Sequence, residues 1–171
     1  MSSKAKKLFL VLTVVVPFLA YCVIYYLPMF KNAPYKIGEF ESLEIKWGEG
    51  NDLVNSYNSA TGDYQYLDGK DSLVKVNVKL RKDDILFLHS KANELGFWNF
   101  PELIANGGTD LKTSKVPRYV MRFNYKKKSK EVIFLSDYNE IPKLRGLAEQ
   151  MKTLLMQTIN AAEERYGKTP Q

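Results

Sequence analysis

The feature that most constrains this chain is an unbroken apolar stretch at residues 8–30 (LFLVLTVVVPFLAYCVIYYLPMF), which contains no charged side chain. At about 1.5 Å per residue, a helix of this length would be roughly 35 Å long. That is enough to cross the hydrocarbon core of a bilayer with some tilt. We therefore predict a transmembrane helix at residues 8–30, which makes the lipid bilayer the first expected partner of the chain.

The length and the far end of this segment favour a retained anchor over a cleaved signal peptide. A signal peptide has an apolar region of roughly 7–15 residues and small residues at its cleavage site, whereas Tyr25 and Tyr26 occupy this end. Bacterial lipidation is the alternative, because the sequence LAYC is similar to a Leu-x-x-Cys motif. However, Tyr21 stands where that motif has a small residue, and an apolar sequence follows Cys22. We predict a signal anchor, with Cys22 as an apolar residue in lipid or at a helix contact.

The span also carries candidate contacts with a partner helix. Pro17 lies near its middle, where it removes a backbone donor, and Tyr21, Tyr25 and Tyr26 lie toward its outer end. The same residues are typical of an ordinary anchor with an interfacial belt of tyrosines, which is the favoured interpretation, and packing against a partner helix is the alternative.

The flanking charges predict the orientation of the span. Lys4, Lys6 and Lys7 precede it, whereas Lys31 and Lys36 follow it. This bias favours a cytoplasmic tail at residues 1–7 and an extracytoplasmic domain after the span. We expect a single-pass protein of the cell (inner) membrane. The sequence after residue 30 contains no cysteine, so we expect neither disulfides nor thiolate chemistry there.

The formal charge of +6 is unevenly distributed along the chain. Five of the 25 basic residues lie in residues 1–38 with no acidic residue, which leaves 20 basic and 19 acidic residues in 39–171. The second part is therefore nearly neutral, and it lacks the basic excess of a nucleic-acid-binding domain. We predict no nucleic-acid partner.

The remaining sequence is organised as a tether at residues 31–38 (KNAPYKIG), one domain at 39–166 and a tail at 167–171. Alternating apolar and polar side chains predict strands at residues 43–47, 53–59, 63–67, 74–80, 119–125 and 130–135.

Two segments have the 3.6-residue period of amphipathic helices. The first runs from Asp83 or Asp84 to Leu95 and ends at Gly96, and the second covers residues 142–166. The order of strands, helix, two strands and helix predicts an α+β domain. We expect an antiparallel sheet with two main helices packed on one face.

This layout resembles the emfourin-type protease-inhibitor domain. The matching pieces are WGEGND, GFWNFPE after the first helix, the hairpin RYVMRFNYKKKSKEVIFLSD, and the step from Asp137 to Pro142 into LRGLAEQMKTLL. The resemblance covers roughly residues 40–157 and is one of spacing and topology. The glycine-rich early loop of that family is replaced here by the sequence GEGN. The resemblance implies a domain that inhibits a protease.

The inventory of chemically active side chains predicts a protein that is not an enzyme. His89 is the only histidine, and we expect it on the surface of the first domain helix. The aspartates around Gly69 lack the spacing of a helix–loop–helix calcium site and are typical of a hairpin turn. Asp110 and Asp137 are the carboxylates considered for catalysis, but no spacing links them. We therefore predict no catalytic residue, no cofactor and no metal site.

Two features of the domain are candidate partner contacts. The lysine run Lys126, Lys127, Lys128 and Lys130 is typical of a solvated hairpin tip, with contact to an acidic partner or to anionic lipid as the alternative. Trp98 either closes the core under the first helix or, if exposed, provides a binding hot spot.

The leading hypothesis is therefore a membrane-anchored, non-enzymatic, extracytoplasmic binding domain. It would act as an accessory or interaction subunit of a membrane-associated assembly, through a membrane or extracytoplasmic protein partner. The alternative is an anchored protease inhibitor of emfourin-like type.

Overall fold

The computed structural model describes residues 3–31 and 35–167, which belong to two compact units divided between Pro34 and Tyr35. The first unit contains one helix, α1 (Ser3–Lys31), which continues through Pro17. Its apolar side chains are exposed from Phe9 to Ile24. Among the described residues, none of the helices is both long enough and apolar enough to cross a membrane. The span predicted at residues 8–30 stays a prediction.

The second unit is built on a seven-stranded sheet with the order β4-β3-β2-β1-β6-β7-β5. Its strands are β1 (Phe40–Glu49), β2 (Asp52–Asn58), β3 (Asp63–Leu67), β4 (Leu73–Asn77), β5 (Leu103–Ile104), β6 (Pro117–Tyr125) and β7 (Lys128–Leu135). The pairs β1–β2, β1–β6, β2–β3, β3–β4 and β6–β7 are antiparallel. The six strands predicted from alternation are all present.

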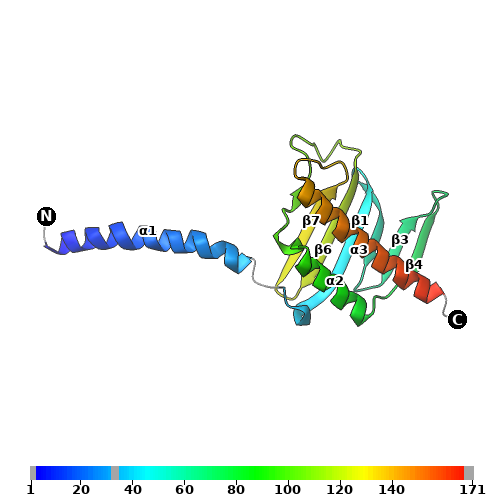
Figure 1. Cartoon of the computed structure of the whole chain (residues 1–171), viewed down its shortest axis with the longest axis horizontal. Coiled ribbons are helices and arrows are strands. Elements are labelled where there is room, and N and C mark those ends of the chain that lie inside the picture. Colours follow the sequence, from blue (N-terminus) through cyan, green and yellow to red (C-terminus); the bar gives the residue numbers. More distant parts are fainter. Residues whose placement is uncertain (1–2, 32–34, 168–171) are drawn as a thin grey trace. The chain divides into compact units, whose positions relative to one another are not determined.

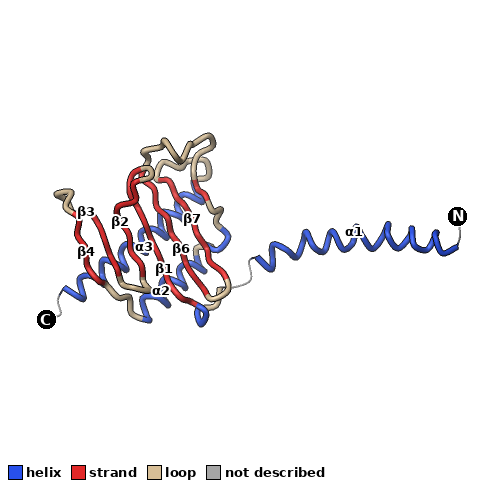
Figure 2. The backbone as a smooth tube through the Cα atoms, turned by 180° about the vertical axis from the view of Figure 1, so that it is seen from behind, coloured by secondary structure: helices blue, strands red, loops and turns tan. Residues whose placement is uncertain are grey.

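Two helices, α2 (Lys82–Glu94) and α3 (Pro142–Gly167), cover one face of this sheet (Figure 1). Figure 2 shows the strands from the opposite side, with no helix in front of them. Arg81 precedes α2 as its N-cap residue, and its backbone N–H donates to the carboxylate of Asp84 at 2.8 Å. The helix ends before Gly96, whose φ of 69° lies in the left-handed region that glycine adopts readily. Both predicted helices are confirmed.

The core lies between the sheet and the two helices. It contains fully buried side chains from the sheet and from the helices, including Leu43, Ile45, Tyr57, Met121, Phe123, Phe134, Leu88, Ala92, Met151, Leu155 and Ile159. Burying a side chain of the Leu or Phe kind stabilises a fold by about 1.5–3 kcal/mol relative to leaving it exposed. The other face of the sheet carries many polar side chains, and Arg122 pairs there with Glu131 at 3.8 Å. This division reproduces the alternation in the sequence.

The sheet differs from the prediction in one respect. β5 pairs with β7 in parallel, through Leu103 with Ile133 and Ile104 with Phe134, so the sheet is mixed rather than antiparallel. A two-residue strand is too short to show an alternation pattern. The α+β class is confirmed, and the purely antiparallel sheet is wrong.

The packed domain begins at Tyr35, inside the stretch expected to be a tether. The Tyr35 ring is buried and stacks on Trp98, with 4.2 Å between ring centroids. It also meets Tyr125 edge-on at 5.0 Å, and the ammonium group of Lys128 lies 3.9 Å above its centroid. A short 3-10 helix, η1 (Ile37–Glu39), then leads into β1.

Candidate functional site

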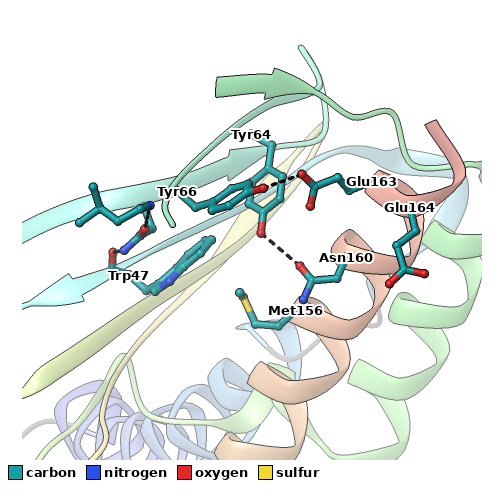
Figure 3. A pocket seen from close by; sticks show the side chains of 9 residues that line it. Trp47, Tyr64, Tyr66, Met156, Asn160, Glu163 and Glu164 are labelled. Carbon is teal, nitrogen blue, oxygen red and sulfur yellow. Dashed lines mark hydrogen bonds between the residues drawn. The ribbon is translucent and has the colours of Figure 1, made fainter. Parts of the chain in front are cut away.

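An open cleft lies between the sheet and the C-terminal half of α3, with a volume of about 420 Å³ (Figure 3). On the sheet side it is lined by Trp47, Asn55, Tyr64, Tyr66 and Leu67. On the helix side it is lined by Met156, Asn160, Glu163 and Glu164. We call this site the aromatic cleft.

Three aromatic rings form the sheet side of the aromatic cleft. Tyr64 and Tyr66 are two residues apart on β3, so the period of the strand directs both rings to the same face. Their centroids lie 4.8 Å apart, and the centroid of Trp47 on β1 lies 6.2 Å from that of Tyr64. The cleft is therefore positioned by rigid strands rather than by loops.

The helix side is formed by residues spaced along one face of α3. Met156, Asn160 and Glu163 follow each other at intervals of four and three residues, which places them on one side of the helix. The Tyr64 hydroxyl donates to Asn160 Oδ1 at 3.1 Å, and the Tyr66 hydroxyl donates to Glu163 Oε1 at 2.8 Å. These two bonds join the wall of the sheet to the wall of the helix (Figure 3).

The tyrosine hydroxyls of the aromatic cleft keep their protons at neutral pH. Burial raises the pKa of Tyr64 to about 12, and the hydrogen bond to Glu163 raises the pKa of Tyr66. Neutral phenols that already donate to α3 are poor acids and poor nucleophiles. The arrangement is therefore suited to holding a group, through ring faces and carboxylate oxygens.

A second cavity of about 340 Å³ shares Asn55 and Leu67 with the aromatic cleft. Three acidic side chains, Glu49, Asp52 and Asp71, line it. Within residues 3–31 and 35–167, no three histidine, cysteine or acidic side chains gather closely enough to hold a metal ion.

The predicted lysine run is divided by the structure. Lys126 and Lys127 are exposed in the turn between β6 and β7, as a hairpin tip requires. Lys128 lies over the ring of Tyr35. Lys130 is half-buried, its Nζ donates to the carbonyl of Phe100, and desolvation lowers its pKa. Lys130 therefore belongs to the packed part of the domain rather than to the tip.

Trp98 closes the core, as the first of its two interpretations predicts. Its half-buried ring lies within an aromatic cluster with Tyr35, Phe97, Phe123 and Tyr125. Its indole N–H donates to Asn93 Oδ1. Trp98 stays a candidate partner contact only through the exposed part of its ring.

The remaining candidate contacts lie on α1. Pro17 and Tyr21 are exposed on this helix. The side chains of Tyr25 and Tyr26 lie outside the residues whose side chains are described. A role for these four residues stays a prediction.

His89 is buried in the core, so the expectation that it lies on the helix surface is wrong. Its Nδ1 is 2.7 Å from the hydroxyl of Tyr125, and its ring centroid is 5.7 Å from that of Trp98. Desolvation lowers the pKa of His89, and burial raises the pKa of Tyr125. A protonated tyrosine hydroxyl can therefore donate to the neutral imidazole.

This environment predicts a pH dependence of stability. Because the pKa of folded His89 lies below its ordinary value of 6.5, the unfolded chain takes up a proton first as the pH falls. The free energy of unfolding should therefore decrease below about pH 6.5 and stop decreasing, for this residue, below the folded pKa. Urea denaturation of the protein and of His89→Gln between about pH 7 and pH 5 measures this, and the variant should show the shallower decrease. Equal slopes would contradict the expectation, because the carboxylates are common to both proteins.

The carboxylates considered for catalysis have separate environments. Asp110 accepts from the backbone N–H of Lys112 at 2.9 Å and from the hydroxyl of Thr113 at 3.0 Å, which is the pattern of a capped turn. Asp137 is exposed on the loop that precedes α3. Neither lines the aromatic cleft or the neighbouring acidic cavity.

None of the residues of the aromatic cleft is among the sequence-based candidates. Two local signals were present: the aromatic pair Tyr64 and Tyr66 on one face of a strand, and the polar pair Asn160 and Glu163 beside the apolar stripe of α3. Neither signal says that the two elements meet, because ninety-six residues separate the hydrogen-bonded partners Tyr64 and Asn160.

Comparisons of the chain with protein families, with curated proteins and with solved structures find no match. The resemblance of residues 40–157 to the emfourin-type domain stays a prediction.

Proposed function

We propose that this protein is a membrane-anchored, non-enzymatic, extracytoplasmic binding protein, and that it acts as an accessory subunit of a membrane-associated assembly. The aromatic cleft is the observation that carries the proposal, and the partner protein binds there. Ligand sites in proteins are concave, rich in aromatic side chains and equipped with a few convergent polar groups. The aromatic cleft has each of these properties.

The anchor is supported by residues 8–30, which carry no charge, and by the helical backbone at Ser3–Lys31. The described side chains of α1 run from residue 9 to residue 24, so they cover only part of the apolar run. An isolated apolar surface of this extent marks an interaction site for lipid or protein. The lysines before the span support a cytoplasmic N-terminus.

A photocrosslinker placed in the aromatic cleft tests whether a partner binds there. We expect p-benzoylphenylalanine at Met156, which is half-buried in the cleft, to form one defined adduct in native membranes. The same group at Lys75, which is exposed on β4, is the matched control and should give no such adduct. The measurement is immunoblotting and mass spectrometry of the full-length chain after irradiation.

The outcomes of this experiment separate the proposed functions. No adduct at Met156, or the same adducts at both positions, would remove the aromatic cleft as the binding site. If the adduct is a protease, the anchored inhibitor of emfourin type replaces the accessory subunit as the leading function.

A further inference from the structure

We propose that the aromatic cleft recognises a cationic group, the guanidinium of an arginine or the ammonium of a lysine presented by the partner. This inference rests on the proposed binding function and specifies the chemistry that the partner must present. Four observations carry it: the rings, the carboxylates, the absence of basic side chains among the described lining residues, and the acidic neighbouring cavity.

The aromatic rings provide the first part of a cation site. The faces of Trp, Tyr and Phe rings carry partial negative charge, and a cation within about 6 Å of a ring centroid is attracted to it. Trp47 has the most favourable ring for this interaction, and Tyr64 and Tyr66 stand next to it. Both hydroxyls donate to residues of α3 (Figure 3), so the phenol protons are already used. The half-buried rings of Trp47 and Tyr66 provide the accessible surface, whereas Tyr64 is buried.

The carboxylates provide the second part. Glu163 Oε1 accepts from Tyr66, and among the described residues no hydrogen bond is donated to Glu163 Oε2. Tyr66 thereby holds the carboxylate in one orientation while one of its oxygens stays available. Glu164, the next residue on α3, is exposed at the same cleft. Hydrogen bonds from a cation to a carboxylate are roughly twice as strong as those between neutral groups.

The lining excludes the other common classes of ligand. None of the nine described residues that line the aromatic cleft is a lysine, an arginine or a histidine, so an anion would meet the carboxylates of Glu163 and Glu164 without a counter-charge from these residues. A purely apolar ligand would desolvate those carboxylates without replacing the hydrogen bonds they make to water. A cation satisfies both the rings and the carboxylates.

The neighbouring cavity is also acidic. It is lined by Glu49, Asp52 and Asp71, and it shares Asn55 and Leu67 with the aromatic cleft. The two neighbouring cavities together are lined by five carboxylates. A partner segment with further basic residues would therefore be attracted to this region, and such attraction weakens as salt is added.

The two tryptophans give the test an internal control. In the full-length chain, labelled with ¹⁵N and held in an uncharged maltoside micelle, each indole N–H gives one NMR signal, and Trp98→Phe assigns them. Titration with N-acetyl-arginine amide or N-acetyl-lysine amide should move the signal of Trp47 and leave that of Trp98 in place. The matched neutral probe, N-acetyl-glutamine amide, should move neither signal.

A pair of charge-removing variants tests the role of Glu163. We expect Glu163→Gln to weaken binding of the cationic probes by roughly tenfold, because the amide keeps the shape of the side chain but not its charge. Glu41→Gln makes the same change at an exposed position on β1 outside the cleft and should leave binding unchanged. Equal losses in the two variants, or equal shifts with the neutral probe, would overturn the proposal.

Comparison of the single amides with an arginine-containing peptide tests whether the cation belongs to a protein segment. Tighter binding of the peptide supports the proposal. Equal binding of peptide and amides overturns the assignment to a partner segment, and no shift of Trp47 with any cationic probe overturns the inference as a whole. The crosslinking experiment at Met156 is independent of these outcomes. A partner captured there without cation binding would overturn this inference alone and leave the proposed function standing.

Discussion

Replacing Phe97 by alanine is expected to lower the free energy of unfolding by roughly 3–5 kcal/mol, the range for large-to-small changes of buried aromatic residues. Phe97 is 0% exposed and belongs to η2 (Phe97–Asn99), which follows α2. Its ring centroid lies 5.3 Å from that of Phe123 and 5.5 Å from that of Phe100. The substitution removes contacts to the sheet and leaves a cavity under α2. Urea denaturation followed by far-UV circular dichroism measures the loss.

The matched control is Phe87→Ala, the same change at a position on α2 that is 44% exposed. Surface substitutions usually change stability by about 0.5 kcal/mol or less, so this variant should remain close to the parent. If both variants lost the same stability, the core would not be centred where the structure has it.

Removing residues 1–31 is expected to move the protein completely from the membrane fraction to the soluble fraction. Each Leu, Ile, Phe or Val near the centre of a membrane helix favours insertion by roughly 0.3–0.6 kcal/mol, and the run at residues 8–30 is rich in these residues. The full chain should therefore stay in the membrane pellet after alkaline carbonate extraction, and the shortened chain should be soluble before any extraction. Centrifugation and immunoblotting measure both fractions.

A chain in which residues 8–30 are replaced by a leucine–alanine segment of equal length controls for specific helix contacts. It should stay in the membrane, because anchoring depends on length and hydrophobicity. If it also loses its partner, Pro17, Tyr21, Tyr25 and Tyr26 contact that partner. Extraction of the full-length chain by carbonate would overturn the anchor.

The secondary structure of the domain could be predicted because its strands and helices each show a characteristic spacing of apolar residues along the sequence. β4 alternates apolar and polar residues from Val74 to Asn77, β6 does so from Met121 to Tyr125, and α3 repeats apolar residues every three or four positions. The ends of the helices could also be predicted from the sequence, since Gly96 follows α2 and Pro142 begins α3. These signals depend only on residues that are close in the sequence, so they can be recognised without knowledge of the fold.

The failures concern residues whose environment comes from distant parts of the chain. His89 follows Leu88 on α2, and nothing local indicates that Tyr125 on β6 supplies its hydrogen-bond partner. The sequence places Lys130 in a basic turn, whereas in the structure its Nζ donates to the carbonyl of Phe100. The aromatic cleft is the same kind of case, because it exists only where β3 and α3 come together.

The two glycines of the sequence WGEGND show that a local pattern can indicate a turn without indicating what each glycine does there. The sequence around Gly48 and Gly50 is typical of a loop. In the structure Gly48 lies within β1, where a Cβ would come 1.9 Å from the carbonyl oxygen of Asp52, so the hairpin requires the absence of a side chain. Gly50 lies in the turn with a φ of 56°, where glycine is favoured.

The packing of Tyr35 has a mechanical consequence for a chain held at its N-terminus. A pull on the segment before residue 35 reaches the stack of Tyr35 on Trp98 before it reaches β1, and β1 is hydrogen-bonded on both sides, to β2 and to β6. Tension is therefore taken up first by ring contacts that can break and re-form singly. The strand beyond them resists as a unit, because its hydrogen bonds to two neighbours share the load. In a chain held in this way, β1 would therefore stay paired after the ring contacts of Tyr35 have broken.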